Sequence, residues 1–290
     1  AVAESDLLEA RADAARDGPA AGHARTRTLG GMTAGFRALC SDFYINQKVS
    51  VKLDLPESRE TILDLFERVR RGFPGMSSFR RYRDELALES PQSETPHRWL
   101  AIRPANIRSG VVNPEEAEAA YGLHRSVLEI APYFLSISPL DIEYIELLYG
   151  FDLAASGNQD AVVARALLSG SPLEPLLDLD RAIPMDFQPL IGMLVLGAEG
   201  ETIASAAAHT EVHFEVKTRS GGASAGREPD VPFDPISVYV TLRKYEPVQD
   251  VKALPGVVDA LAELGEELVT SRALPHLVRP IREAISSDEV

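Results

Sequence analysis

Two stretches of this chain share one layout, and their repetition restricts the folds that the chain can adopt. Residues 42–55 (DFYINQKVSVKLDL) and 139–153 (PLDIEYIELLYGFDL) are rich in apolar and aromatic residues, and both end in an apolar–Asp–Leu triplet. In both, a glycine that begins a Gly-x-Pro follows the aspartate by 18 positions (72 − 54 and 170 − 152). This matched spacing predicts an internal duplication, in which residues 36–132 and 139–285 adopt one topology.

Alternating apolar and polar residues predict strands, and apolar residues spaced three and four apart predict helices. The strands are expected at residues 42–55, 85–90, 98–103, 140–153, 190–196, 203–216 and 236–243. The helices are expected at residues 58–72, 114–131, 159–169 and 255–285, with Ser58 and Asn113 as N-caps and breaks near Pro275 and Pro280. Each half then reads β-α-β-β-α, with an extra hairpin strand in the second. This order predicts an α+β protein of two related halves with mostly antiparallel sheets.

The two halves are expected to occupy residues 36–138 and 139–290, after a flexible N-terminal arm at residues 1–35. The arm begins with helix-forming residues whose apolar stripe is thin, and continues with Gly, Ala, Thr and Arg without periodicity. Deleting the arm should therefore leave the melting temperature nearly unchanged. The loop at residues 220–235 is rich in Gly, Ser and Ala, and we expect it to be among the most mobile parts of the protein.

In its layout, the second half resembles a sporadically distributed family of uncharacterised bacterial proteins. The C-terminal parts of that family run from a Tyr-containing strand through a short helix and a proline segment to a long hairpin and a terminal helix, which corresponds here to residues 144–285. The family carries an Arg-Tyr-x-Asn-type strand where this chain has Glu143-Tyr144-Ile145-Glu146. The resemblance implies a similar order of elements and no particular activity.

Charge and cysteine content exclude several classes of function. The formal net charge of −15 argues against general binding to nucleic acid or anionic membranes, which requires an excess of Lys and Arg, so any anion site must be local. The single cysteine, Cys40, excludes an internal disulfide and a cysteine-rich metal site. No apolar run reaches the roughly 18 residues of a membrane span, and the N-terminal residues are too charged for a secretion signal. We expect a soluble, cytoplasmic protein without a cofactor.

One basic cluster stands out against this acidic background. Residues 68–83 (RVRRGFPGMSSFRRYR) hold six arginines and no acid, with two phenylalanines and a tyrosine interleaved. Guanidinium groups and aromatic rings together can hold a phosphate, a carboxylate or a single-stranded nucleic acid. The residues expected to bind such a small anionic ligand are Arg70, Arg71, Arg80, Arg81 and Arg83. The alternative is a basic helix end that complements the helix dipole and forms ion pairs with surrounding acids.

A second pattern places titratable residues on one face of a strand. His209, Glu211, His213 and Glu215 alternate with Thr210, Val212 and Phe214 in the expected strand at residues 203–216. Side chains two residues apart on one face are about 6.6 Å apart, so a metal held by three of them would require side chains that lean inward. A solvated outer face is the plainer interpretation, and no metal site is predicted.

The remaining motifs do not indicate catalysis. Glycine-rich nucleotide loops, a Walker loop and the His-Glu-x-x-His motif are absent. Cys40 has apolar neighbours typical of a packing residue, and Trp99 is expected to be a core anchor with His97 at the end of its strand. We therefore predict a non-catalytic binding or interaction module. The alternatives are a metal-dependent enzyme that uses the strand histidines and an assembly protein whose arm docks on a partner in a homo-oligomer.

Overall fold

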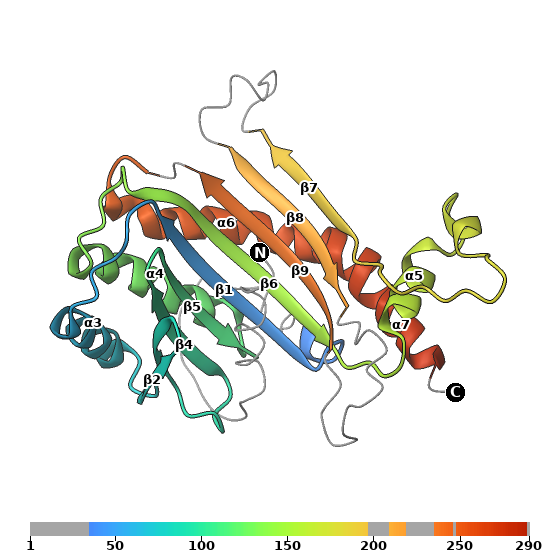
Figure 1. The fold of residues 1–290 in the computed structure, drawn as a ribbon. Helices are drawn as coiled ribbons and strands as arrows, with labels where there is room; N and C mark the ends of the chain where they lie inside the picture. The colour runs from blue at the N-terminus through green and yellow to red at the C-terminus, as the bar shows by residue number, and fades with distance from the viewer. Residues whose placement is uncertain (1–34, 197–208, 219–234, 246–247, 289–290) are drawn as a thin grey trace.

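The computed structural model describes residues 35–196, 209–218, 235–245 and 248–288. The predicted arm (apart from Gly35) and the predicted loop at residues 220–235 (apart from Pro235) lie outside the described residues. Nine strands form one sheet in the order β2-β3-β4-β5-β1-β6-β9-β8-β7, and all neighbouring strands are antiparallel (Figure 1). The predicted α+β class with an antiparallel sheet is confirmed.

The strands vary in length from edge to centre. They are β1 (Asp42–Val51), β2 (Ser78–Tyr82), β3 (Glu85–Glu89), β4 (His97–Arg103), β5 (Asn106–Val112), β6 (Ile142–Leu153), β7 (Leu190–Val195), β8 (Thr210–Lys217) and β9 (Ile236–Tyr245). The longest, β1, β6 and β9, lie side by side in the middle of the sheet (Figure 1).

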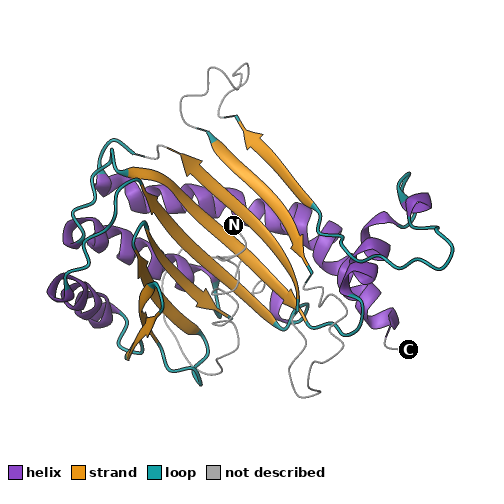
Figure 2. Ribbon diagram, in the orientation of Figure 1, coloured by secondary structure: helices purple, strands orange, loops and turns teal. Residues whose placement is uncertain are grey.

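The described helices leave one face of the sheet uncovered (Figure 2). They are α3 (Arg59–Gly72), α4 (Ala117–Phe134), α5 (Gln159–Leu168), α6 (Leu254–Leu268) and α7 (Arg279–Asp288), with 3₁₀ turns η1 (Glu174–Leu176) and η2 (Val251–Ala253) and a π-helical segment η3 (Val269–Val278). Helix α4 packs against β1 and β5, α6 packs against β6 and β9, and α3 lies beside α4. The described residues thus form a helical layer and a sheet, one face of which no described helix covers; we call it the helix-free face.

The two halves of the chain meet at the centre of the sheet. Strand β1 pairs with β6 along nearly its whole length, from Asp42 opposite Asp152 to Val51 opposite Ile142. Each half places its first strand at this junction and its last strand, β5 or β9, directly outside it. The order of elements is therefore similar in the two halves, in keeping with the predicted duplication, which stays a prediction.

The strand count of the first half differs from the predicted one. Strands β2 and β5 lie where none was expected, so the first half reads β-α-β-β-β-β-α and the second reads β-α-β-β-β-α. The extra strand belongs to the first half, and β5, not the strand at 98–103, precedes α4. Strand β2 (SFRRY) was missed because it is an exposed edge strand whose central residues are all exposed, which removes the alternation that marks a half-buried strand.

One of the two predicted helix caps is confirmed and the other is wrong. Ser58 caps α3 by accepting a hydrogen bond from the backbone N–H of Thr61. Asn113 does not cap α4, whose N-cap is Glu116. Its backbone is left-handed, with φ of 52°, and its side chain accepts a hydrogen bond from the N–H of Phe43 at 3.0 Å. Asn113 thus follows the last residue of β5, and its hydrogen bond to Phe43 joins the end of β5 to the start of β1.

The core lies between the sheet and the helices, and a hydrogen-bonded group of three polar residues is buried in it. Ser109 Oγ donates to Gln47 Oε1 at 3.0 Å and lies 2.8 Å from Nδ1 of His124. All three side chains are at most 1% exposed. A polar residue at this depth is tolerated only when it is hydrogen-bonded, so the three side chains depend on one another.

The C-terminal helical region continues through both of its prolines. Residues 254–288 pass from α6 through η3 into α7 without a break. A break was predicted near Pro275, but the wider turns of the π-helical η3 accommodate this proline within the helix. Pro280 lies at the junction between η3, which ends at Val278, and α7, which begins at Arg279. Across the described ranges, none of the helices combines the length and the apolar run that a bilayer span requires.

Candidate functional site

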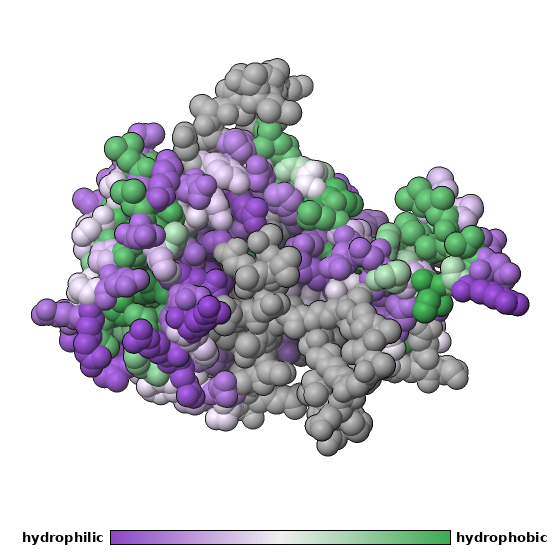
Figure 3. Space-filling model, viewed as in Figure 1, coloured by the Kyte–Doolittle hydropathy of each residue, from purple (hydrophilic) through white to green (hydrophobic). Residues whose placement is uncertain are grey.

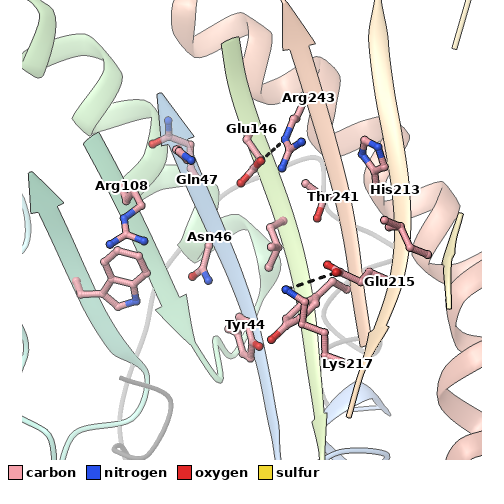
Figure 4. Close-up of a pocket in the computed structure, with 15 residues that line it drawn as sticks. Tyr44, Asn46, Gln47, Arg108, Glu146, His213, Glu215, Lys217, Thr241 and Arg243 are labelled. Carbon is pink, nitrogen blue, oxygen red and sulfur yellow. Dashed lines mark hydrogen bonds and ion pairs between the residues drawn. The ribbon is translucent and has the colours of Figure 1, made fainter. Parts of the chain in front are cut away.

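A pocket of about 300 Å³ lies on the helix-free face, where β5, β1, β6, β9 and β8 run side by side (Figure 4). Alternation along each strand determines which side chains enter it, because successive residues point to opposite faces. The pocket is lined by Tyr44, Asn46, Gln47 and Lys48 from β1, Trp99 from β4, Arg108 from β5, Glu146 and Leu148 from β6, Leu190 from β7, His213, Glu215 and Lys217 from β8, and Tyr239, Thr241 and Arg243 from β9. Both halves of the chain therefore contribute to one site.

Two glycines make room for the large side chains of this face. A Cβ on Gly110 would lie 2.2 Å from Asn46 Oδ1 and 2.4 Å from a ring carbon of Trp99. A Cβ on Gly150 would lie 2.1 Å from a ring carbon of Tyr44. Real Cβ contacts are never this short. The ring of Trp99 therefore fits only because Gly110 has no side chain, and the ring of Tyr44 fits only because Gly150 has none.

The charge of the pocket is opposite in sign to that of the chain. Four cations (Lys48, Arg108, Lys217 and Arg243) and two carboxylates (Glu146 and Glu215) line it, a difference of 4 − 2 = +2 against a chain total of −15. Arg243 Nε is 2.5 Å from Glu146 Oε2, and Lys217 Nζ is 3.4 Å from Glu215 Oε1. A local positive excess inside a partly desolvated cavity attracts anions.

One of these cations is held by a buried carboxylate next to the pocket. Arg108 donates to Glu85 Oε2, and Arg103 Nε donates to the same oxygen at 3.0 Å. The side chains of Glu85 and Arg108 are 1% and 5% exposed. Two guanidinium groups share this one carboxylate, and the charge-assisted hydrogen bond fixes the orientation of Arg108.

Two tyrosines, Tyr44 and Tyr239, lie at the end of the pocket near the start of β1. Their ring centroids are 6.4 Å apart, and Tyr44 Oη donates to Asp152 Oδ1 at 3.2 Å. Burial, together with the nearby charge of Asp152, raises the pKa of Tyr44 well above its usual value and also raises the pKa of Tyr239. Both phenols are therefore protonated at neutral pH and can act as hydrogen-bond donors.

Asn46 brings to the pocket an acceptor that has no partner within the described protein. Asn46 is 8% exposed, and its Oδ1 is buried without a hydrogen bond in the part of the chain that the structure describes. Figure 4 shows Asn46 on β1, with Arg108 on the neighbouring strand β5 and Glu146 on the other neighbour, β6. An unpaired buried amide oxygen costs about 1–3 kcal/mol, which a ligand that donates a hydrogen bond would recover.

The five arginines predicted to bind an anion are not gathered at this pocket, and none of them lines it. Arg70 and Arg71 lie on the exposed last turn of α3 and form ion pairs with Glu67, at 2.9 Å and 3.8 Å. Arg80 and Arg81 are neighbours on β2 and point to opposite faces of the sheet. Phe79, one of the interleaved aromatic residues, packs on Phe66 of α3 with ring centroids 5.9 Å apart.

A second pocket, of about 410 Å³, brings two of the predicted arginines together. It lies between the start of α3 and the β2–β3 turn, and Arg59, Arg81, Arg83 and Arg103 line it with three acidic residues. Its lining charge is thus 4 − 3 = +1, and the acids Glu57, Asp84 and Glu85 are distributed among the arginines. The prediction that the arginine cluster binds an anion is reduced to this pair, and it stays a prediction.

Of the two histidines predicted to share a strand, His213 lies in β8 and His209 directly precedes it, and they do not form a ready metal site. His213 lines the first pocket, whereas His209 stacks on Tyr245 with ring centroids 5.1 Å apart. Within the described ranges, no group of three or more His, Cys, Asp or Glu residues is arranged to hold a metal ion. The described residues therefore provide no ligand set for the metal-dependent alternative.

Cys40 is a packing residue in this structure. Its Sγ donates to the carbonyl of Phe36 at 3.2 Å, and burial, with the charges of Asp152 and Asp42, raises the pKa of the thiol to about 12. The group is therefore a neutral thiol at physiological pH, which is a poor nucleophile.

Comparison with known proteins leaves the site to be interpreted from its own chemistry. A scan against protein-family models finds no match to this chain, and a search of curated proteins finds no significantly similar sequence. The resemblance of residues 144–285 to an uncharacterised bacterial family is therefore still a prediction. The pocket residues themselves follow from strand alternation, but nothing local in the sequence indicates which strands become neighbours.

Proposed function

We propose that this chain is a binding module whose helix-free face holds a small organic anion. The pocket suits a molecule with one carboxylate or phosphate group, an apolar portion, and a hydroxyl or amine that donates a hydrogen bond. Its volume of about 300 Å³ is at the lower end of the range for small-molecule sites.

The observation that carries this proposal is the unpaired Oδ1 of Asn46. Protein interiors rarely retain a buried acceptor without a partner, because the group lowers stability and gives nothing in return. Asn46 stands among four cationic side chains and beside the rings of Trp99 and Tyr44. A ligand held by these groups would place its anionic end near the cations, its apolar part on the rings and its donor on Asn46.

The positive excess selects the charge of the ligand, and the neighbouring carboxylates limit its size. Glu146 and Glu215 already neutralise Arg243 and Lys217 in part, so the pocket favours one anionic group over several. Long polyanions are disfavoured, because the rest of the chain is strongly acidic and repels them. The proposal therefore concerns a metabolite-sized acid and excludes nucleic acid.

Replacing Asn46 by Leu should separate binding from stability. We expect N46L to raise the unfolding free energy by about 1 kcal/mol, since it removes an unpaired buried acceptor at nearly constant volume. The same change should weaken binding of the best ligand about tenfold, because the hydrogen bond to Oδ1 is lost. Sugar phosphates, nucleoside monophosphates and hydroxycarboxylates would be screened by thermal shift at low salt, and hits measured by titration calorimetry.

The double variant R81A/R83A is the matched control, because it removes charge from the second pocket and leaves the first intact. Affinity for the ligand should be unchanged in this variant and should fall as salt is raised. If R81A/R83A abolishes binding while N46L does not, the ligand belongs to the arginine cluster and our proposal is wrong. It is also wrong if no compound of the three classes binds the unmodified chain at low salt.

A further inference from the structure

The two edges of the sheet differ in how they are protected from pairing with another strand. At one edge, β2 carries the exposed arginines Arg80 and Arg81, and charged residues of this kind prevent edge-to-edge association. At the other edge, β7 (LIGMLV) contains no charged residue and no proline. Its Leu190, Ile191 and Met193 are 60%, 56% and 46% exposed. An apolar edge of this type usually has a partner.

The outward backbone groups of β7 are available for a further strand. Val216 N–H donates to the carbonyl of Pro189 at 2.9 Å, which sets the phase of the ladder between β7 and β8. By alternation, Ile191 and Met193 direct their N–H and C=O groups toward β8, and Leu190, Gly192 and Leu194 direct theirs away from it. In the sheet formed by the described residues, nothing pairs with this outer side.

Apolar exposure extends from β7 into the segment that precedes it. Of fifteen large apolar side chains that are exposed in the described part of the chain, ten lie between Leu173 and Leu196. Figure 3 shows them gathered on one side of the molecule, over β7 and over the projecting segment around η1. The segment extends past the end of β7, beyond the edge of the sheet (Figure 1).

We propose that β7 pairs with β7 of a second copy of this chain, which joins two nine-stranded sheets across a twofold axis. The sequence of β7 is suited to self-pairing in one register, with Gly192 opposite Gly192 of the second copy. Leu190 then faces Leu194, and both residues have outward backbone groups, as an antiparallel hydrogen-bonded pair requires. Ile191 of one copy faces Met193 of the other, and these side chains lie on the opposite face of the sheet from Leu190 and Leu194. Every cross-strand pair is therefore apolar or glycine.

Self-pairing also accounts for the exposed segment around η1. A stable interface buries roughly 800 Å² on each partner, more than a six-residue strand supplies by itself. In a twofold arrangement the projecting segment of each copy extends over the edge of the other, so its apolar side chains add to the contact. A second copy is favoured over a different protein because this one register leaves neither a charge nor an unmatched bulky residue on β7.

Two double variants of the full chain test the proposal and its register. In I191K/M193K each introduced lysine faces a lysine of the second copy, and like charges directly opposite one another destabilise a ladder. In I191E/M193K each glutamate faces a lysine, so the pairing regains a favourable contact. Sedimentation velocity over a wide concentration range should show a dimer for the unmodified chain. The affinity between the two copies should be about tenfold weaker, or more, in I191K/M193K, and it should be restored in I191E/M193K.

The variant L140K is the control, since Leu140 is an 87% exposed apolar residue far from β7 in sequence. It should dimerise like the unmodified chain, and circular dichroism should show all variants folded. A monomer at every concentration of the unmodified chain overturns the proposal. Equal behaviour of the two charged variants, whether both dimeric or both monomeric, also overturns it, because only β7 self-pairing in this register distinguishes them. If only a foreign strand binds β7, the unmodified chain stays monomeric.

Discussion

Gly150→Ala is expected to lower the unfolding free energy by about 3 kcal/mol, although it adds only one methyl group. The new Cβ would lie 2.1 Å and 2.3 Å from two ring carbons of Tyr44. That ring cannot easily move away, because it is 6% exposed and its hydroxyl is bonded to Asp152. Chemical denaturation followed by fluorescence would measure the loss.

The same substitution elsewhere gives the control. Gly256 is exposed on α6 with no atom within 4 Å of an added Cβ, so G256A should raise stability by about 0.5–1 kcal/mol. If the loss at Gly150 comes from the clash, the double variant Tyr44→Ala/Gly150→Ala should be less destabilised than the sum of its single changes. Strict additivity would show that another effect is responsible.

Acid should destabilise the protein through His124, well above the pH at which carboxylates are protonated. Complete burial lowers the pKa of this imidazole from 6.5 to about 3, so it is neutral in the folded chain. The depressed pKa leaves stability intact above pH 6.5, where the unfolded chain is also neutral. Below pH 6.5 only the unfolded chain gains a proton, so stability falls by about 1.4 kcal/mol per pH unit until pH 3.

Denaturation at several pH values should therefore show a loss of about 2 kcal/mol between pH 6.5 and pH 5 that is due to this one group. In His124→Gln that part of the loss should be absent, because glutamine does not titrate and can still bond to Ser109. His276 is exposed on η3, and H276Q is the matched control that should keep the slope of the unmodified chain. An unchanged slope in His124→Gln would contradict the assignment.

Local patterns in the sequence predicted most of the individual elements. Alternation along β1 and β6 and the apolar face of α3 are properties of a few neighbouring residues, and Ser58 caps its helix by a contact three residues away. Strand β2 was missed because its three central residues are all exposed, and Asn113 was misassigned because its partner, Phe43, lies 70 residues earlier. Interactions over such separations leave no local signal.

The candidate site was predicted less well than the fold, for the same reason. The sequence shows that Asn46 and His213 lie on polar faces of their strands, and a polar face normally means exposure to solvent. Only the strand order β5-β1-β6-β9-β8 makes these faces adjacent and buries Asn46 among cations. The arginine cluster was chosen because its charge is concentrated in sequence, whereas the cations of the pocket come from four different strands.

The ladder between β1 and β6 also determines when this protein can finish folding. Strand β6 begins 91 positions after β1 ends (142 − 51), and β5 begins 55 positions after it (106 − 51). At a synthesis rate of roughly 5–20 residues per second, the nascent chain carries β1 for about 5–20 s before its central partner exists. During that interval β1 has a bare edge at what will become the middle of the sheet. High contact order of this kind makes folding slow, and an unpaired strand edge on the growing chain is prone to aggregate until the second half emerges.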